Sequence, residues 1–163
     1  MSDDSQRIAR IDIESPGVVR FHPDVEREIQ VAVFDLVEEN TFRPETDYFG
    51  GAPAGPYALT LAIVENRLNF RIAADGGDEV GMLTVPLTPF RKIIKDYFTV
   101  CESYYQAIRS ASPSQIEAID MGRRGLHNEG SDRLRDQLAG RVEVDQITAR
   151  RLFTLICALH IRA

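Results

Sequence analysis

The sequence predicts a single α+β domain. We expect a four-stranded, mainly antiparallel sheet, made of an N-terminal strand and a three-stranded meander, packed against about five helices. Apolar residues that alternate with polar ones gather in the N-terminal half, which is the pattern of half-buried strands. Nearly everything after Thr88 carries apolar residues at helical spacing instead. No linker separates two hydrophobic stretches, and 163 residues suit one domain, so we treat residues 1–163 as one unit.

The first strand is predicted over residues 8–13, where isoleucines alternate with charged residues. The polar residues before it, 1–7, are predicted to be a disordered tail. A helix opens around His22-Pro23-Asp24, because proline favours the first helical turn, and its apolar spacing ends near Asn40. Residues 41–56 contain three prolines and three glycines and are predicted to be a mobile loop.

The clearest strand signal follows this loop. Apolar residues alternate with others over residues 59–63 and again over residues 68–72. Glu65-Asn66 lies between the two runs, and Asn tolerates the positive φ of a two-residue hairpin turn. Residues 75–78, Asp-Gly-Gly-Asp, form a second turn, and a strand over residues 80–87 completes the meander.

Two long helices are predicted in the C-terminal half. The first begins at Thr88-Pro89, because apolar residues then recur on one face over about five turns. This stripe comprises Phe90, Ile93, Ile94, Tyr97, Phe98, Cys101, Tyr105 and Ile108. The other helix begins near Asp145. The residues that we expect it to bury are Ile147, Leu152, Leu155, Ile156 and Leu159.

Two further helices are predicted between these. Residues 112–115, Ser-Pro-Ser-Gln, form a capping box that begins the first of them, with inward-facing isoleucines behind it. We expect Gly122 and Gly125 to loosen or end that helix, because each glycine costs a helix about 1 kcal/mol relative to alanine. A short helix is then predicted over residues 128–138, closed by Gly140.

Charge is unevenly distributed along the chain. The net charge of −6 divides into −9 over residues 1–87 and +3 over residues 88–163. The acidic N-terminal half argues against a protein that binds nucleic acid over its whole surface, because such proteins present a net basic face. The basic C-terminal half leaves room for a local anion site, and RNA binding there is one alternative.

Composition also bears on location and cofactors. No apolar stretch approaches the roughly 20 residues of a membrane helix, and the acidic N-terminus is unlike a secretory signal. We therefore expect a cytoplasmic protein without a membrane partner. Cys101 and Cys157 fall on apolar stripes and are expected to be buried, reduced thiols. The three histidines show no spacing of metal ligands, so neither a metal nor a cofactor is predicted.

A dense polar segment, residues 119–131, is the candidate site. Its two arginines could hold a phosphate or carboxylate in a bidentate way, and its histidine could titrate near neutral pH. A free helix N-terminus near Asn128 would attract an anion. Tyr104, on the preceding helix, could stack on a base. The candidate residues are Arg123, Arg124, His127, Asn128, Glu129 and Tyr104.

A purely structural interpretation of this segment remains open. Gly122 and Gly125 could simply turn a helix corner, Asn128 could cap the next helix, and the arginines could pair with neighbouring acids. Arg150-Arg151 lies in the middle of the last helix and is interpreted as a solvated or salt-bridged face. The chain lacks a Gly-x-Ser-x-Gly nucleophile elbow, and neither cysteine has an evident base in the sequence.

Several runs of residues carry a family resemblance that covers nearly the whole chain. They are residues 37–40, 63–68, 87–126, 126–131 and 148–157. On these runs the chain resembles the UPF0262 family of uncharacterised alphaproteobacterial proteins. The first half departs more, most clearly in the glycine- and proline-rich segment 43–56. The resemblance implies no activity, cofactor or catalytic residue.

Together these observations favour a non-catalytic binding or regulatory protein. It would present the candidate site to a protein partner, which includes a second copy of the chain, or to an anionic small molecule. The alternative from another class is a small enzyme that acts on a phosphorylated or nucleotide substrate. In that case His127 or Glu129 would be the general acid–base and the arginines would clamp the phosphate. The enzyme requires a concave pocket that joins Arg123, Arg124 and His127, and Tyr104 is a further candidate for its lining.

Overall fold

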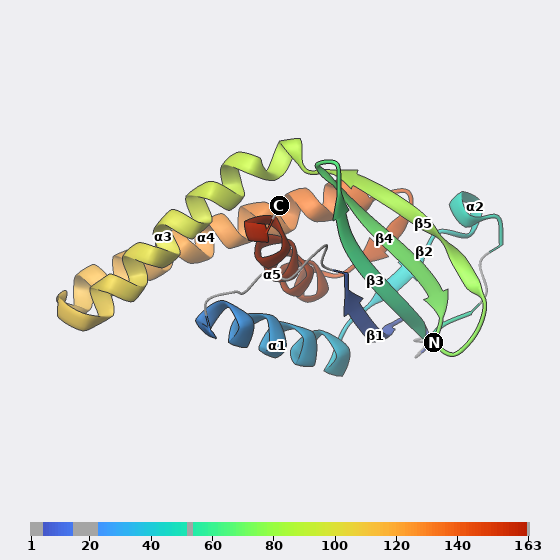
Figure 1. Ribbon diagram of the computed structural model, residues 1–163, viewed down its shortest axis with the longest axis horizontal. Coiled ribbons are helices and arrows are strands. Elements are labelled where there is room, and N and C mark those ends of the chain that lie inside the picture. Colours follow the sequence, from blue (N-terminus) through green and yellow to red (C-terminus); the bar gives the residue numbers. More distant parts are fainter. Residues whose placement is uncertain (1–4, 15–22, 52–53, 163) are drawn as a thin grey trace.

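The computed structural model describes residues 5–14, 23–51 and 54–162, and its fold is α+β, as predicted. The main sheet and one short helix lie at one end of the molecule and the long helices toward the other, with two of them projecting as a hairpin (Figure 1). The strands are β1 (Ile8–Ile13), β2 (Phe42–Pro44), β3 (Tyr57–Val64), β4 (Arg67–Ala74), β5 (Glu79–Pro86) and β6 (Val142–Val144). The helices are α1 (Pro23–Glu38), α2 (Thr46–Phe49), the 3₁₀ helix η1 (Thr88–Phe90), α3 (Arg91–Ser110), α4 (Pro113–Leu138) and α5 (Gln146–Arg162).

The main sheet has four strands in the order β1-β3-β4-β5. The meander β3-β4-β5 is antiparallel, as the alternation predicts, whereas β1 pairs parallel with β3, so the sheet is mixed. Glu65 and Asn66 form the predicted turn, with φ of 51° and 62°. On β4, Leu68, Phe70 and Ile72 are fully buried, and the residues between them are not. One face of the sheet therefore packs on the core.

A second, two-stranded sheet joins segments that are far apart in the sequence. β2 pairs antiparallel with β6, so that Phe42 lies opposite Val144, and both side chains are buried. The segment 41–56, predicted to be a loop, therefore contains β2 and the short helix α2. Residues 52–53 of that segment, residues 1–4 of the predicted tail and His22 at the predicted helix start lie outside the described residues.

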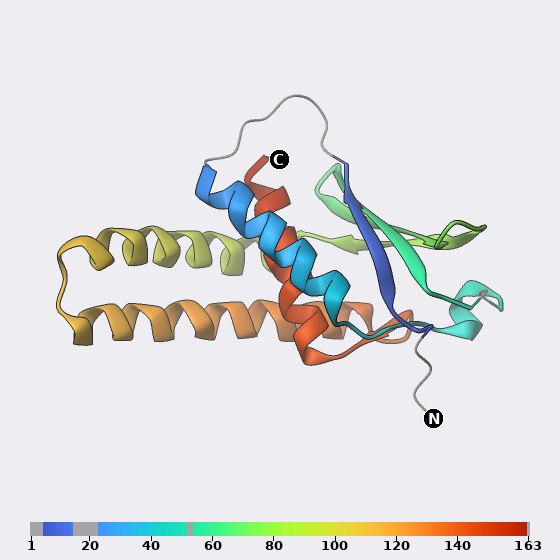
Figure 2. The ribbon, with the colours of Figure 1, turned by 90° about the horizontal axis from the view of Figure 1, so that it is seen from below.

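The helices α3 and α4 run side by side in opposite directions and project beyond the rest of the molecule (Figure 2). The predicted capping box begins α4: the Ser112 hydroxyl accepts from the Gln115 amide, and the Gln115 side chain accepts from the Ser112 amide. The predicted break at Gly122 and Gly125 is wrong, because α4 is continuous over 26 residues. No helix therefore begins near Asn128.

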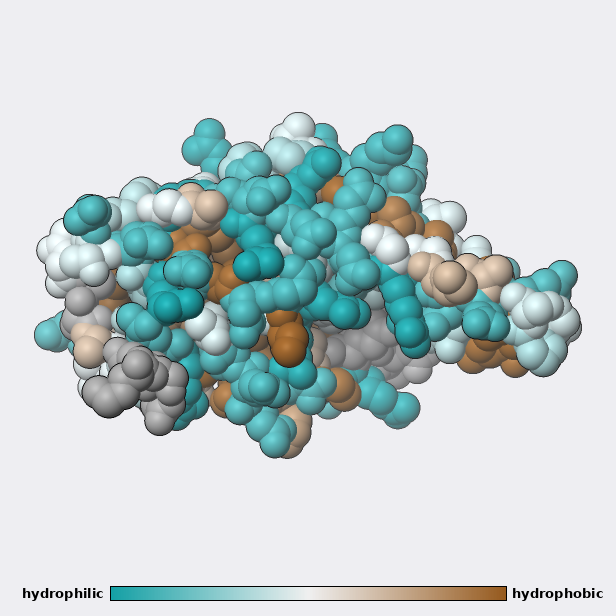
Figure 3. All heavy atoms as spheres, turned by 180° about the vertical axis from the view of Figure 1, so that it is seen from behind, coloured by the Kyte–Doolittle hydropathy of each residue, from teal (hydrophilic) through white to brown (hydrophobic). Residues whose placement is uncertain are grey.

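Some apolar residues that periodicity assigns to the core are exposed. Tyr105 and Ile108, at the projecting end of α3, are 39% and 51% exposed, and Ile147 on α5 is 47% exposed. On the face shown in Figure 3, hydrophilic side chains dominate and hydrophobic ones reach the surface in small patches, also on the projecting hairpin. The core covers the part of α3 nearest the sheet, which leaves apolar residues at the far end of α3 more exposed.

The core lies where α5 crosses between the sheet and the other helices. Leu152, Phe153 and Leu155 of α5 are fully buried, and α1 packs along the outer side of α5 (Figures 1 and 2). The Asn40 side chain bonds to both backbone groups of Ile8, at 2.6 and 2.9 Å, and so fixes the end of α1 to β1. Cys101 and Cys157 are buried, as predicted. Among the described residues, none of the helices has the length and apolar character that a membrane crossing demands.

Candidate functional site

A cleft of about 700 Å³ opens between α1, α4 and α5, with Tyr97 of α3 contributing to its lining. Three of the predicted site residues, Arg123, Arg124 and His127, line this cleft. They come from one face of α4, because residues at positions i and i+4 lie one above the other on a helix. The concave pocket that the enzyme alternative requires around these three side chains is therefore present, although Tyr104 is not among its lining residues.

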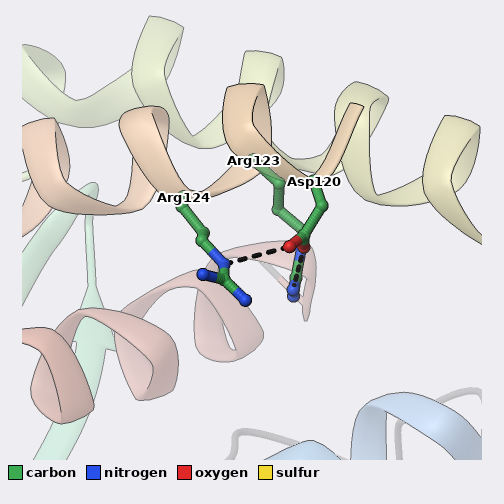
Figure 4. Close-up of polar contacts among 3 residues, drawn as sticks. All are labelled: Asp120, Arg123 and Arg124. Atoms are coloured by element: carbon green, nitrogen blue, oxygen red, sulfur yellow. Dashed lines mark hydrogen bonds and ion pairs between the residues drawn. The ribbon is translucent and has the colours of Figure 1, made fainter. Parts of the chain in front are cut away.

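Arg123 and Arg124 share one carboxylate, Asp120 (Figure 4). The Nε and Nη2 atoms of Arg123 lie 3.1 and 2.6 Å from Oδ1 of Asp120, and Nε of Arg124 lies 3.0 Å from its Oδ2. The hydrogen bond from Arg123 holds the pKa of Asp120 below its ordinary value, although partial burial opposes this. All three side chains extend from α4 toward α5 (Figure 4). Together they keep a net positive charge at the cleft.

Among the described residues, five arginines and one acidic residue line the cleft. The arginines are Arg27, Arg123, Arg124, Arg150 and Arg151, and the acidic residue is Asp35. The guanidinium groups repel one another, and the packing of α1, α4 and α5 holds them at the same cleft in spite of this repulsion. The cleft is thus a local basic surface on a chain whose overall charge is negative.

The cleft arginines differ in how they are held. Nη1 of Arg151 donates to the backbone oxygens of Asp35 and Glu39, at 2.9 and 3.0 Å, where a cation stabilises the C-terminal end of α1. Arg27 and Arg150 make neither an ion pair nor a side-chain hydrogen bond with any residue that the structure describes. Arg124 is 67% exposed and is held only through its Nε. These last three guanidinium groups are the ones available to a ligand.

His127 lies at the inner side of the cleft. Its Nε2 is 2.8 Å from the Thr154 hydroxyl and its Nδ1 is 3.5 Å from the Ser131 hydroxyl. Its ring packs against Tyr97 and Phe153, with centroids 5.5 and 5.3 Å away. Burial, followed by the charges of nearby arginines, lowers the pKa of His127 to about 4. The imidazole is therefore neutral at pH 7 and does not titrate there, contrary to expectation.

The other predicted site residues lie away from the cleft. Asn128 and Glu129 are exposed on α4 and do not line it, because adjacent helical positions point about 100° apart. Tyr104 is half-buried, and the guanidinium carbon of Arg123 lies 4.9 Å from the centre of its ring. That contact is a cation–π interaction, so Tyr104 positions Arg123 and does not face the cleft.

Sequence analysis overlooked Arg27, Arg150 and Arg151. The sequence pattern indicates a solvated or salt-bridged face for Arg150 and Arg151, and the contact between α5 and α1 brings them to the cleft. The positive charge of residues 88–163 was a signal for Arg150 and Arg151, whereas Arg27 lies in the acidic half of the chain. Among the described residues, no group of three or more His, Cys, Asp or Glu side chains could hold a metal ion.

The chemistry available in the cleft is recognition of negative charge. Guanidinium groups donate in a planar, bidentate geometry that matches phosphate and carboxylate oxygens. The walls also carry apolar side chains, Val31 and Ala32 of α1 and Ile147 of α5. A cleft of this volume is within the range of small-molecule sites, about 300–1,000 Å³.

Comparison with known proteins identifies the family of the chain. The model of the uncharacterised protein family UPF0262 matches residues 5–162. The chain is 60% identical to a UPF0262 protein of Chelativorans sp. (strain BNC1) over 164 residues, which is 99% of each chain. It is 62% identical to one of Rhizobium meliloti over 143 residues, 88% of this chain and 87% of the other, and 55% identical to one of Brucella canis over 163 residues, 99% of each. No solved structure matches this fold significantly. The predicted resemblance is confirmed, and the chain belongs to the UPF0262 family.

Proposed function

We propose that this protein is a non-catalytic binding protein whose cleft between α1, α4 and α5 takes an anionic ligand. The observation that carries the proposal is the lining of the cleft: among the described residues it contains five arginines and one acidic residue, Asp35, and two of the arginines share the carboxylate of Asp120. Arg27 and Arg150 lack an acidic partner among the described residues, and Arg124 uses only one of its nitrogens. A bound phosphate or carboxylate would relieve the repulsion among these groups.

Physical considerations favour a ligand over an empty surface. These five arginines come from three helices and converge on one concavity, and two of them, Arg27 and Arg150, make no ion pair with a described residue. Field lines concentrate in a cleft with low-dielectric walls, which raises the local concentration of an oppositely charged ligand. Charge-assisted hydrogen bonds to guanidinium groups are also about twice as strong as neutral ones. Affinity should therefore fall as salt is added.

The contacts of His127 support binding over catalysis. Both of its ring nitrogens face protein hydroxyls, those of Thr154 and Ser131, and its lowered pKa leaves little base strength. Glu129, the other proposed acid–base, does not line the cleft. The alternative of an enzyme acting on a phosphorylated substrate would have to use Asp35, or Asp120 with its lowered pKa, as its base.

Isothermal titration of the full chain with inorganic phosphate and pyrophosphate, at low salt, tests the proposal. We expect pyrophosphate to bind and Arg150→Gln to weaken it about tenfold, as for loss of a charge-assisted hydrogen bond. Arg109→Gln is the matched control, because Arg109 is an exposed helical arginine outside the cleft. Equal weakening in both variants, or no binding by the unmodified chain, would contradict the proposal.

A single-stranded RNA oligonucleotide in the same titration separates the remaining alternative. RNA binding through a general basic surface would weaken alike in Arg150→Gln and Arg109→Gln, with a steep dependence on salt. RNA binding that is stronger than pyrophosphate binding and equally weakened by Arg150→Gln and Arg109→Gln would favour that alternative over the anion cleft.

A further inference from the structure

We infer that the anion in this cleft carries an apolar group, so that the ligand is a soluble amphiphilic phosphate or carboxylate. The inference rests on the proposed function and names the class of its ligand. The charged end would lie among Arg124, Arg150 and Arg27. The apolar part would lie against Val31 of α1 and Ile147 of α5.

The first observation is the exposure of these two apolar residues. Val31 is 52% exposed and Ile147 is 47% exposed. Nearby residues of the same helices are buried: Ala32 is 6% exposed and Ala149 is 0% exposed. A single exposed aliphatic side chain is ordinary on a protein surface. Here two of them, from two different helices, line one cleft together with the arginines.

The second observation is that neither a purely hydrophilic anion nor a purely apolar molecule can interact favourably with both the charged and the apolar residues of the lining. A small hydrophilic anion would pair with the guanidinium groups and leave Val31 and Ile147 in water. A wholly apolar ligand would cover these two residues and strip water from unpaired cations, which is costly. Only a ligand with both characters uses both parts of the lining.

The third observation is the size and shape of the site. The cleft holds about 700 Å³, far more than a phosphate ion fills, and small-molecule sites commonly combine a mainly apolar wall with a few polar groups. Because the arginines and Ile147 line a concavity, a flat bilayer surface would not reach them all. The shape therefore favours a free amphiphile over an anionic lipid headgroup in a membrane.

A series of alkyl phosphates tests this inference with the headgroup held constant. Methyl, butyl and hexyl phosphate are titrated into the full chain below their micelle concentrations. We expect hexyl phosphate to bind about thirtyfold more tightly than methyl phosphate, since each fully buried methylene adds about fourfold and an open cleft would bury about half of the area of the five additional methylenes. Arg150→Gln should weaken every member of the series by a similar factor and leave this ratio unchanged.

Substitutions of the apolar wall complete the design. Val31→Thr keeps the shape of the side chain but replaces one methyl group with a hydroxyl, and should lower the hexyl-to-methyl ratio about threefold. Ile147→Thr should act in the same direction, and because both residues are exposed the variants should fold. Val64→Thr is the matched control, since Val64 is 50% exposed on β3 and does not line the cleft. It should leave the ratio unchanged.

The outcomes distinguish the two proposals. If methyl phosphate or pyrophosphate binds in an Arg150-dependent way but the alkyl series is flat, the amphiphile is overturned and the anion cleft stands. If none of these anions binds, both proposals fail. If vesicles containing phosphatidylglycerol capture the protein through Arg150 and Val31 while hexyl phosphate does not bind, the surface docks on membranes and the soluble amphiphile is overturned.

Discussion

The two halves of α4 share one continuous helix and lie in very different surroundings. In the half that packs on the body, Ser131, Leu134 and Leu138 are at most 1% exposed. In the projecting half, Met121 is 66% exposed, and α3 is its neighbour (Figure 2). This difference in exposure between the two halves shows that helical periodicity identifies the apolar face of a helix but not the position along the helix at which the core ends.

The cleft lies where these two halves meet. Arg123 and Arg124 belong to the last turn before the helix enters the body, and His127 belongs to the first turn that α5 covers. A charged ligand there would contact an exposed, adjustable arginine on one side and a fixed, packed imidazole on the other. Substitutions that compare the stability of the two halves of α4 therefore also test how firmly the residues of the cleft are held.

The largest expected effect concerns His127 and pH. Because the pKa of His127 is about 4 in the folded chain and about 6.5 in an unfolded one, protonation favours unfolding. The neutral imidazole of His127 therefore contributes to the free energy of unfolding in full above pH 6.5. This contribution declines as the pH falls toward 4 and changes no further below pH 4. A shift of this size corresponds to about 3 kcal/mol of unfolding free energy.

Urea unfolding at a series of pH values measures this contribution, with His127→Gln as the reference. The stability difference between the two chains should shrink by up to about 3 kcal/mol between pH 6.5 and pH 4. Subtracting the variant removes the titration of Asp120 and Asp145, whose pKa values are also lowered. A difference that stays constant over this range would show that His127 is not held neutral by burial and by its arginine neighbours.

The next effect concerns Gly130, in the packed half. A Cβ atom at this position would overlap ring carbons of Phe153, which is fully buried in α5. Relief requires α4 and α5 to move apart, so Gly130→Ala should destabilise the chain by about 2 kcal/mol, despite the better helix propensity of alanine. The midpoint of thermal unfolding should fall accordingly. An unchanged or raised midpoint would mean that the two helices are less closely packed than described.

Much of the fold could be predicted from local pattern, and the misses have a common cause. The meander, the Glu65-Asn66 turn and the capping box at Ser112 depend on residues close together in the sequence. The parallel pairing of β1 and the contact between β2 and β6 depend on distant segments. A three-residue strand such as β2 is too short to show alternation.

The site was predicted in part for the same reason. Arg123, Arg124 and His127 are close together in the sequence, so the sequence alone predicts that they form a cluster. Arg27 and Arg150 join them only because α1 and α5 pack beside α4, which no spacing rule reveals. The sequence places several acidic residues near Arg123 and Arg124, and any of them could pair with these arginines. The structure shows that Asp120 is the partner of both.

The smallest effect concerns Gly122 and Gly125, in the projecting half, which sequence analysis took as a helix break. A Cβ atom at either position meets no other atom within 4 Å. Alanine should therefore stabilise α4 by about 1 kcal/mol at each site, because glycine lowers helix propensity without a compensating contact.

Hydrogen exchange of the α4 backbone amides is the measurement that reports this gain, because the projecting end can open without unfolding the body. Exchange around residues 115–125 should slow about fivefold in Gly125→Ala, which converts the helix-propensity gain into a protection factor. The amides of the packed half, which open only with the body, should change less, whereas Gly130→Ala should accelerate exchange there. Faster exchange in Gly125→Ala would mean that α4 bends at this glycine in solution and that the two halves are separate helices after all.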